Sequence, residues 1–234
     1  MEKIIAVIQS RFNSTRLPGK AMLPLAEKPL LEHVIDRVQK LKNVDLVIVA
    51  TGIHESNQPI VDLARSKGCN VYRGPDEDVL KRFYDATNYR SCQYVIRATG
   101  DNPFVDVELG NKLIQKELKD KIDYYGMSGI PIGVGIEMFK KSALDRAYSE
   151  SKRKSDREHV TTYIKLNNHI FHSEFMDMGI VQGEGLRLTV DYKSDYILAS
   201  KIYEELYHGK PFSIQEVLKF LKKNPELIAG VEIE

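Results

Sequence analysis

Residues 9–20, QSRFNSTRLPGK, gather three cations and three hydroxyl groups directly after the apolar run IIAVI. Arg11 carries a planar guanidinium that pairs with two phosphate oxygens at once, whereas Lys20 carries a mobile point charge. Ser14 supplies a hydrogen-bonding hydroxyl, and Gly19 permits a backbone turn with positive φ. These residue types at this spacing predict a site for an anionic ligand.

Two common phosphate-binding motifs do not match the chain. A Walker A loop would need glycine at Ser14 and serine or threonine at Ala21. The other glycine-rich stretch, GVGIEMF at 133–139, lacks the third glycine of a dinucleotide fingerprint. The anionic ligand is therefore expected to bind in another way.

Several polar residues follow apolar runs that we expect to be strands. In open α/β sheets, ligands bind at the carboxyl ends of the strands, where such residues meet. The residues at these ends are Gln9, Ser10, Arg11, Thr51, Arg73, Arg97, Thr99, Asp101 and Asp191. They are the first candidates for a site.

The first half of the chain alternates strand and helix patterns. Short runs rich in Val and Ile indicate strands buried on both faces, and apolar stripes at helical spacing lie between them. We expect strands at 3–9, 45–51, 69–74 and 93–99, and helices at 29–41, 57–68 and 76–89. This order predicts an α/β fold with a doubly wound, mostly parallel sheet and right-handed crossovers.

The pattern is less regular after about residue 120, and we expect an elaborated C-terminal half. The expected strands are 122–126, 135–139, 169–178 and 186–191, and the expected helices are 141–150, 155–167, 193–207 and 213–223. With no repeat or linker in the sequence, residues 1–234 are expected to form one domain, with a nucleotide-binding half at 1–120 and an acceptor-binding half at 121–234 that could also form a homodimer.

Composition narrows the function classes. The 234 residues carry a net charge of +1, which argues against bulk binding of nucleic acid or of acidic membranes, so a basic site must be local. The two cysteines, Cys69 and Cys92, have no metal-binding spacing and form no disulfide framework. The chain has no apolar run long enough for a signal peptide or a membrane span, and we expect a cytoplasmic protein.

The segment RFNSTRLPGK closely resembles the signature of the CMP-sugar synthetases, which are cytidylyltransferases. Their pattern of Arg, two residues, Ser, one residue and Arg-Leu-Pro-Gly-Lys is complete from Arg11 to Lys20. The stretches 73–83, 133–139 and 156–164 resemble the branch related to spore coat polysaccharide biosynthesis protein F. The resemblance implies a fold like that of nucleotide-diphospho-sugar transferases, with CTP bound and pyrophosphate released.

Two further segments resemble the metal-binding segments of the same family. Asp101 in RATGDNPFVD and Asp191 in LRLTVDYKSD correspond to aspartates that bind Mg²⁺ there. The alternative for Asp101 is a turn or a helix cap, and Asp195 is interpreted as a helix cap. Tyr192 departs from the Thr or Ser that commonly follows the second aspartate.

The resemblance also implies roles for single residues. Arg11, Lys20 and Asp101 are expected to be catalytic, and Asp101 and Asp191 to bind the metal. The expected nucleotide-binding residues are Gln9, Ser10, Ser14, Arg16, Gly19, Thr51, Arg73, Arg97 and Thr99. The candidates for binding the acceptor are Glu137, Glu158 and His159, although the last two could simply pair with each other on a helix.

The function expected from these features is Mg²⁺-dependent transfer of CMP from CTP to a sugar or sugar-acid acceptor, in the biosynthesis of a surface polysaccharide or glycoconjugate. The acceptor and the general base stay open. A glycosyltransferase that uses Asp76 and Asp78 as an acid-x-acid metal motif is the alternative. Acidic residues in the first turn of a helix also have a simpler explanation, because they interact favourably with the helix dipole.

Overall fold

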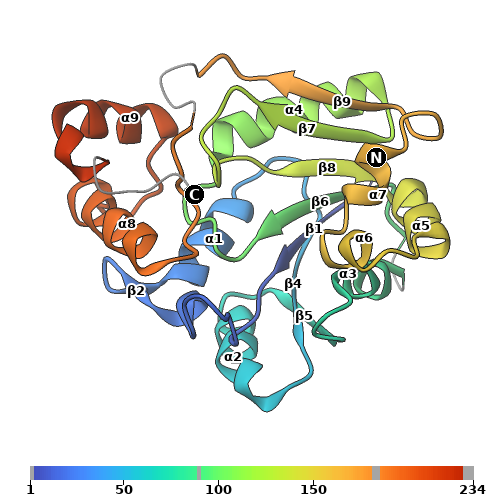
Figure 1. Ribbon diagram of the computed structural model, residues 1–234, viewed down its shortest axis with the longest axis horizontal. Coiled ribbons are helices and arrows are strands. Elements are labelled where there is room, and N and C mark those ends of the chain that lie inside the picture. The colour runs from blue at the N-terminus through green and yellow to red at the C-terminus, as the bar shows by residue number, and fades with distance from the viewer. Residues whose placement is uncertain (1–2, 89–90, 181–184, 229–234) are drawn as a thin grey trace.

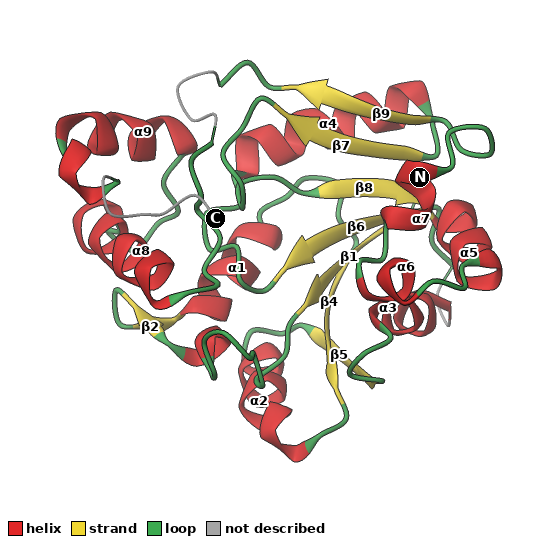
Figure 2. Cartoon of the chain, viewed as in Figure 1, coloured by secondary structure: helices red, strands yellow, loops and turns green. Residues whose placement is uncertain are grey.

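The computed structural model describes residues 3–88, 91–180 and 185–228. A seven-stranded sheet with the order β5-β4-β1-β6-β8-β7-β9 forms its centre, and helices cover both faces (Figures 1 and 2). The strands of the sheet are β1 Ile4–Gln9, β4 Leu46–Gly52, β5 Asn70–Gly74, β6 Tyr94–Thr99, β7 Tyr124–Ser128, β8 Glu137–Lys140 and β9 Ser173–Asp177. A separate small hairpin pairs β2 Pro24–Leu25 with β3 Lys28–Pro29.

The helices connect these strands and close the chain. The α-helices are α1 Leu30–Val38, α2 Gln58–Ser66, α3 Val79–Asn88, α4 Val107–Asp120, α5 Lys141–Glu150, α6 Lys154–Glu158, α7 Thr162–Leu166, α8 Lys193–Leu206 and α9 Ile214–Lys223. Every neighbouring pair of strands in the sheet is parallel except the two that include β8. The predicted doubly wound, mostly parallel sheet is confirmed.

Strand β1 shows how the sheet forms two cores. Its side chains alternate between the faces, so Ile4 and Ile8 pack into one hydrophobic cluster and Ile5 and Val7 into the other. The first cluster includes buried side chains of α1, α2, α4, α8 and α9, and the second includes those of α3, α5 and α7. Because both faces are covered, the strand needs no polar side, which explains its continuous apolar sequence.

Two expected elements differ in the structure. The helix expected at 155–167 is divided into α6 and α7, and Val160 between them has a φ of 57°, a value that a β-branched residue rarely adopts. The strand expected at 186–191 is an irregular segment with a single bridge, from Arg187 to Ile132. This segment instead lies next to the loop after β6, because Val190 N donates to Asp101 O at 2.9 Å.

Helix α4 is present although the sequence reading did not assign it. Asp106 caps its N-terminus, where its side chain accepts from Leu109 N at 3.0 Å. Leu109, Leu113 and Ile114 are buried on the side that faces the sheet. An acidic cap followed by apolar residues at helical spacing was the available signal.

The carboxyl ends of the parallel strands form one edge of the sheet. Gln9 at the end of β1 is in register with Thr99 at the end of β6, and Gly52 is in register with Gly74. The loops that leave this edge therefore start close together.

In the described part of the chain, no helix combines the length and the apolarity needed to cross a membrane.

Candidate active site

Backbone hydrogen bonds hold the loop after β1, which ends at Lys20, in place. Ser10 N donates to Ala50 O at 3.1 Å, and Gly19 N donates to Phe12 O at 3.0 Å. Gly19 has a φ of 71°, a backbone conformation that favours glycine, and it packs against the Phe12 ring. The loop leads into a short 3₁₀ helix, Lys20–Met22, whose first residue is buried.

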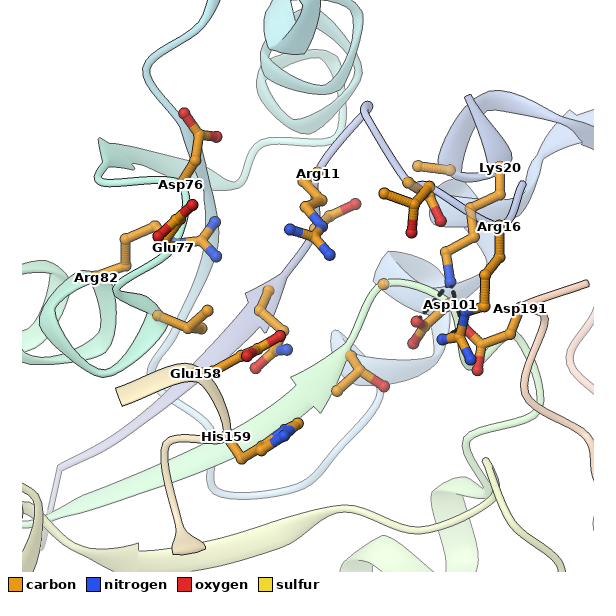
Figure 3. A pocket seen from close by; sticks show the side chains of 18 of the residues that line it. Arg11, Arg16, Lys20, Asp76, Glu77, Arg82, Asp101, Glu158, His159 and Asp191 are labelled. Carbon is orange, nitrogen blue, oxygen red and sulfur yellow. Dashed lines mark hydrogen bonds and ion pairs between the residues drawn. The ribbon is translucent and has the colours of Figure 1, made fainter. Parts of the chain in front are cut away.

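The ammonium of Lys20 binds three oxygens from two distant segments (Figure 3). Its Nζ lies 2.8 Å from Asp101 Oδ2, 2.7 Å from Asp191 Oδ1 and 2.9 Å from the carbonyl oxygen of Val190. An ammonium has three hydrogen-bond donors, so this arrangement satisfies all of them. The predicted cation and both predicted metal-binding carboxylates thus meet at one point.

Asp191 is the more enclosed of the two carboxylates. Burial by itself would raise its pKa, but the hydrogen bond and charge of Lys20, with Arg16 and Arg187, outweigh that effect and hold its pKa below the ordinary value. Arg16 lies 2.7 Å from Asp191 Oδ1, and Arg187 lies 3.1 Å from Oδ2. Tyr192, the departure from the family pattern, accepts a hydrogen bond from Arg16 at 3.4 Å.

Asp195 fixes the turn that presents Asp191. Its Oδ2 accepts from the backbone N–H of Asp191 at 2.9 Å and of Tyr192 at 3.0 Å, at the start of α8. The interpretation of Asp195 as a helix cap is confirmed. Arg187 binds both Asp191 and Asp195, and the sequence reading did not select it.

A cavity of ≈ 480 Å³ opens beside this cluster. Eleven of the predicted residues line it: Gln9, Ser10, Arg11, Ser14, Arg16, Lys20, Thr99, Asp101, Glu158, His159 and Asp191. Residues not assigned to the cytidylyltransferase site also line it, among them Thr15, Asp76, Glu77, Arg82 and Lys154. Figure 3 shows Arg11 between the Lys20 cluster on one side and Asp76, Glu77 and Arg82 on the other.

Glu158 and His159 extend into the cavity from the end of α6, where the backbone turns sharply at Val160. Both side chains are exposed, and they form no hydrogen bond or ion pair with each other in the described part of the chain. The alternative of a mutually satisfied pair is therefore not what the structure shows.

Five predicted residues lie outside the set that lines the cavity. Gly19 shapes the loop, and Thr51 is fully buried in β4. Arg73 donates to the carbonyl oxygens of Gly52, Ile53 and His54. The remaining two, Arg97 and Glu137, bind each other.

Arg97 and Glu137 form the centre of a partly buried polar network that lies outside the set of residues lining the cavity. Glu137 accepts from Arg97 at 2.5 Å, from Tyr124 at 2.6 Å and from Lys165 at 3.1 Å. Burial would raise its pKa, but Arg97 and Lys165 lower the pKa to about 2. Because Arg97 also donates to Gln9 at 3.0 Å, the network positions a residue that lines the cavity.

The structure assigns Arg82 to the cavity, which sequence reasoning missed. It lies on the buried face of α3 together with Val79 and Phe83. A cation among apolar residues at helical spacing was the signal that could have identified it.

Comparisons with known proteins identify the family and the fold. The family model for cytidylyltransferases matches residues 5–222. Spore coat polysaccharide biosynthesis protein SpsF of Bacillus subtilis is 32% identical over 97% of both chains. A cytidylyltransferase structure from Leptospira borgpetersenii superposes with a TM-score of 0.92 and 27% identity over 100% of both chains.

A more distant neighbour shares the fold. The structure of CMP:2-keto-3-deoxy-manno-octonic acid synthetase complexed with CTP has a TM-score of 0.68 and 17% identity, over 88% of this chain and 100% of that one. The fold and the charged cavity at the strand ends define a nucleotidyltransferase. Within that class, the chain belongs to the cytidylyltransferase family.

The Glu137 network gives a stability prediction. Glu137→Gln leaves Arg97 and Lys165 without their buried counter-charge, and we expect it to destabilise the fold by about 3 kcal/mol at pH 7. Because the folded pKa of about 2 lies below the ordinary glutamate value of 4.5, this carboxylate stabilises the fold above about pH 4.5, and the contribution is lost as the pH falls toward 2. Urea unfolding at pH 7 and at pH 3 measures the effect.

The matched control for this measurement is Glu150→Gln, which removes an exposed ion pair with Arg146. Exposed pairs contribute at most about 1 kcal/mol. Equal losses of stability for the two variants at pH 7 would contradict the structural role of Glu137.

Proposed function

We propose that this protein catalyses divalent-metal-dependent transfer of CMP from CTP to a sugar or sugar-acid acceptor, with release of pyrophosphate. The observation that carries the proposal is the meeting of Lys20, Asp101 and Asp191 beside a cavity that Arg11 also lines. Surface polysaccharide or glycoconjugate biosynthesis is the proposed context. Its support is the similarity to SpsF over the whole chain.

The proposed reaction breaks one bond and forms one. An oxygen of the acceptor attacks the α-phosphorus of CTP, the bond between the α-phosphorus and the bridging oxygen breaks, and its electron pair leaves with pyrophosphate. Such a step depends on in-line positioning and on stabilising negative charge as it develops. Arg11 makes no hydrogen bond or ion pair in the described part of the chain, so its guanidinium is available to the phosphates.

Asp101 and Asp191 fit the ligand set of a hard divalent cation. Mg²⁺ is commonly held by one or two carboxylates together with substrate phosphates and water. No group of three or more possible metal-binding side chains occurs among the described residues. When bound, such a metal polarises the phosphate and neutralises its charge. It has to compete with the Lys20 ammonium for both carboxylates.

We place the acceptor near Glu158 and His159. Their exposed side chains extend into the cavity from α6, and their polar atoms have no hydrogen-bond partner among the described residues, so they are available to hydroxyl groups. Glu137 has no such role, because its carboxylate oxygens accept from Arg97, Tyr124, Thr161 and Lys165. A homodimer formed through the C-terminal helices stays a prediction, and sedimentation analysis tests it.

The glycosyltransferase alternative has weaker support from the same site. Arg157 donates to Asp78 Oδ2 at 3.0 and 2.5 Å, and Asp78 also accepts from Lys81 N. Asp78 is therefore occupied by structural contacts, whereas Asp76 lines the cavity. The acid-x-acid motif does not present two free carboxylates at one point.

The first test concerns the two carboxylates. In a screen of acidic sugars and sugar phosphates with CTP and Mg²⁺, pyrophosphate release should stop when a chelator is added. Asp101→Asn and Asp191→Asn should each lower kcat/KM by about a hundredfold or more, because each removes charge from the metal site. The exposed Asp62→Asn on α2 is the control with the same chemical change. Near-normal turnover by either site variant, with an unchanged melting temperature, would exclude the two-aspartate site.

The second test concerns Arg11 and the leaving group. If Arg11 stabilises departing pyrophosphate, Arg11→Ala should lower kcat as well as weaken CTP binding, because charge on the leaving group grows as the bond breaks. Arg11→Lys should restore little, since an ammonium lacks the two-pronged contact. Mass analysis should find a CMP conjugate with an equal amount of pyrophosphate. A transferred sugar with free nucleoside diphosphate would instead indicate a glycosyltransferase.

A further inference from the structure

The contacts of Lys20 conflict with both roles that its cluster has in the proposed function (Figure 3). All three donors of its ammonium are used, by Asp101, Asp191 and the carbonyl oxygen of Val190. An ammonium engaged in this way cannot also donate to a phosphate. The same contacts place a cation at the point where a divalent metal would bridge the two carboxylates. Binding of either the phosphates or the metal therefore requires Lys20 to leave its position.

The position of the Lys20 ammonium suits a small metal ion as well. The three oxygens around its Nζ come from two carboxylates and one backbone carbonyl, and they lie at 2.7–2.9 Å. Mg²⁺ and Mn²⁺ prefer oxygen ligands, and Mg²⁺ holds them at about 2.0–2.1 Å, so a small approach of these oxygens would fit the metal. The metal and the ammonium are thus alternative occupants of one position, because two cations repel each other there.

Asp191 has further partners that remain when the ammonium leaves. Arg16 lies 2.7 Å from its Oδ1, Arg187 lies 3.1 Å from its Oδ2, and its backbone N–H donates to Asp195. Lys20 also lines the cavity, and its flexible four-carbon side chain can turn toward an anion bound there. The carboxylate can therefore stay in place while the cation beside it is exchanged.

We propose that Lys20 holds the place of the divalent metal, and that the metal takes this position as the ammonium moves to the triphosphate of the nucleotide. This proposal rests on the proposed function and deepens it. The exchange puts two positive charges in place of one between the carboxylates and gives the phosphates a cation of their own. Triphosphate and metal are then positively coupled, and each raises the affinity for the other by the same factor.

The first measurement is the affinity for Mn²⁺ alone, from the electron paramagnetic resonance signal of the free ion. Lys20→Met removes the competing ammonium and should bind Mn²⁺ at least about tenfold more tightly than the wild type. Lys154→Met is the matched control, because it removes the same charge from a cavity-lining side chain that is 82% exposed. The control should change Mn²⁺ affinity by less than about twofold, since water and salt screen an exposed charge.

A double variant locates the metal that Lys20→Met binds. Lys20→Met/Asp101→Asn should lose the gain in Mn²⁺ affinity, because one of the two carboxylates is then neutral. A gain that persists in the double variant would place the metal elsewhere and overturn the proposal. If Lys20→Met fails to fold, as judged by thermal denaturation, Lys20→Gln replaces it, since its amide can still donate to the carbonyl oxygen of Val190.

The second measurement is the affinity for inorganic tripolyphosphate, by calorimetry in buffer freed of divalent metals. Asp101→Asn weakens the hold on the Lys20 ammonium and should bind tripolyphosphate at least about threefold more tightly than Glu77→Gln does. Glu77→Gln is the control, because it removes the same charge from an exposed side chain of the same cavity. If Lys20 only supported the fold, these substitutions would lower the melting temperature and tighten neither ligand.

Two further results would overturn the proposal. Lys20→Met that binds Mn²⁺ no more tightly than Lys154→Met would show that the ammonium does not compete with the metal. Asp101→Asn that binds tripolyphosphate no more tightly than Glu77→Gln would show that the carboxylates do not restrain Lys20. Neither measurement uses CTP or an acceptor. Failure of the proposed function is distinguishable, because the wild type would then release no pyrophosphate from CTP with any acceptor.

Discussion

The ammonium of Lys20 joins three parts of the chain that are far apart in sequence. Its partners are 81, 170 and 171 residues away, and they belong to the loop after β6 and the segment before α8. Removing one charge from such a buried group leaves the others without compensation, which is strongly unfavourable. The position of the irregular segment 186–191 therefore depends on this interaction, together with the hydrogen bond from Val190 to Asp101.

The charged side chains around the cavity differ in how many hydrogen bonds and ion pairs they form. Asp191 and Lys20 are held in a dense cluster, whereas Arg11 forms no hydrogen bond or ion pair in the described part of the chain. At the far end, Arg82 is buried, and its Nε has no hydrogen-bond partner among the described residues. The charges that are held in pairs fix the loops around the cavity, whereas those without a partner in the described part of the chain are available to a ligand.

A second layer of charge supports the cavity without lining it. Glu137 accepts from side chains of β6, β7 and α7, and through Arg97 it is linked to Gln9 at the end of β1. It also binds Thr161, which follows the strained Val160. That strain sits next to the two residues, Glu158 and His159, that enter the cavity from α6. Such backbone conformations persist only where surrounding contacts hold them in place.

The sequence by itself determined the sheet and the signature loop. Continuous apolar strands separated by amphipathic helices have one favourable arrangement, and the Arg11–Lys20 signature has fixed local spacing, so both could be recognised from neighbours along the chain. The Asp195 cap was predictable for the same local reason.

Only the tertiary structure decided which charges meet. Arg73 was predicted to bind the nucleotide from a strand end and Glu137 to bind the acceptor, yet their partners are backbone carbonyls and the Arg97 side chain, which the sequence does not place. Arg82 enters the cavity because packing turns that face of α3 toward it, and the segment 186–191 leaves the sheet because Lys20 and Asp101 hold it elsewhere. Local propensity acts over a few residues, whereas these contacts join segments that only the folded sheet brings together.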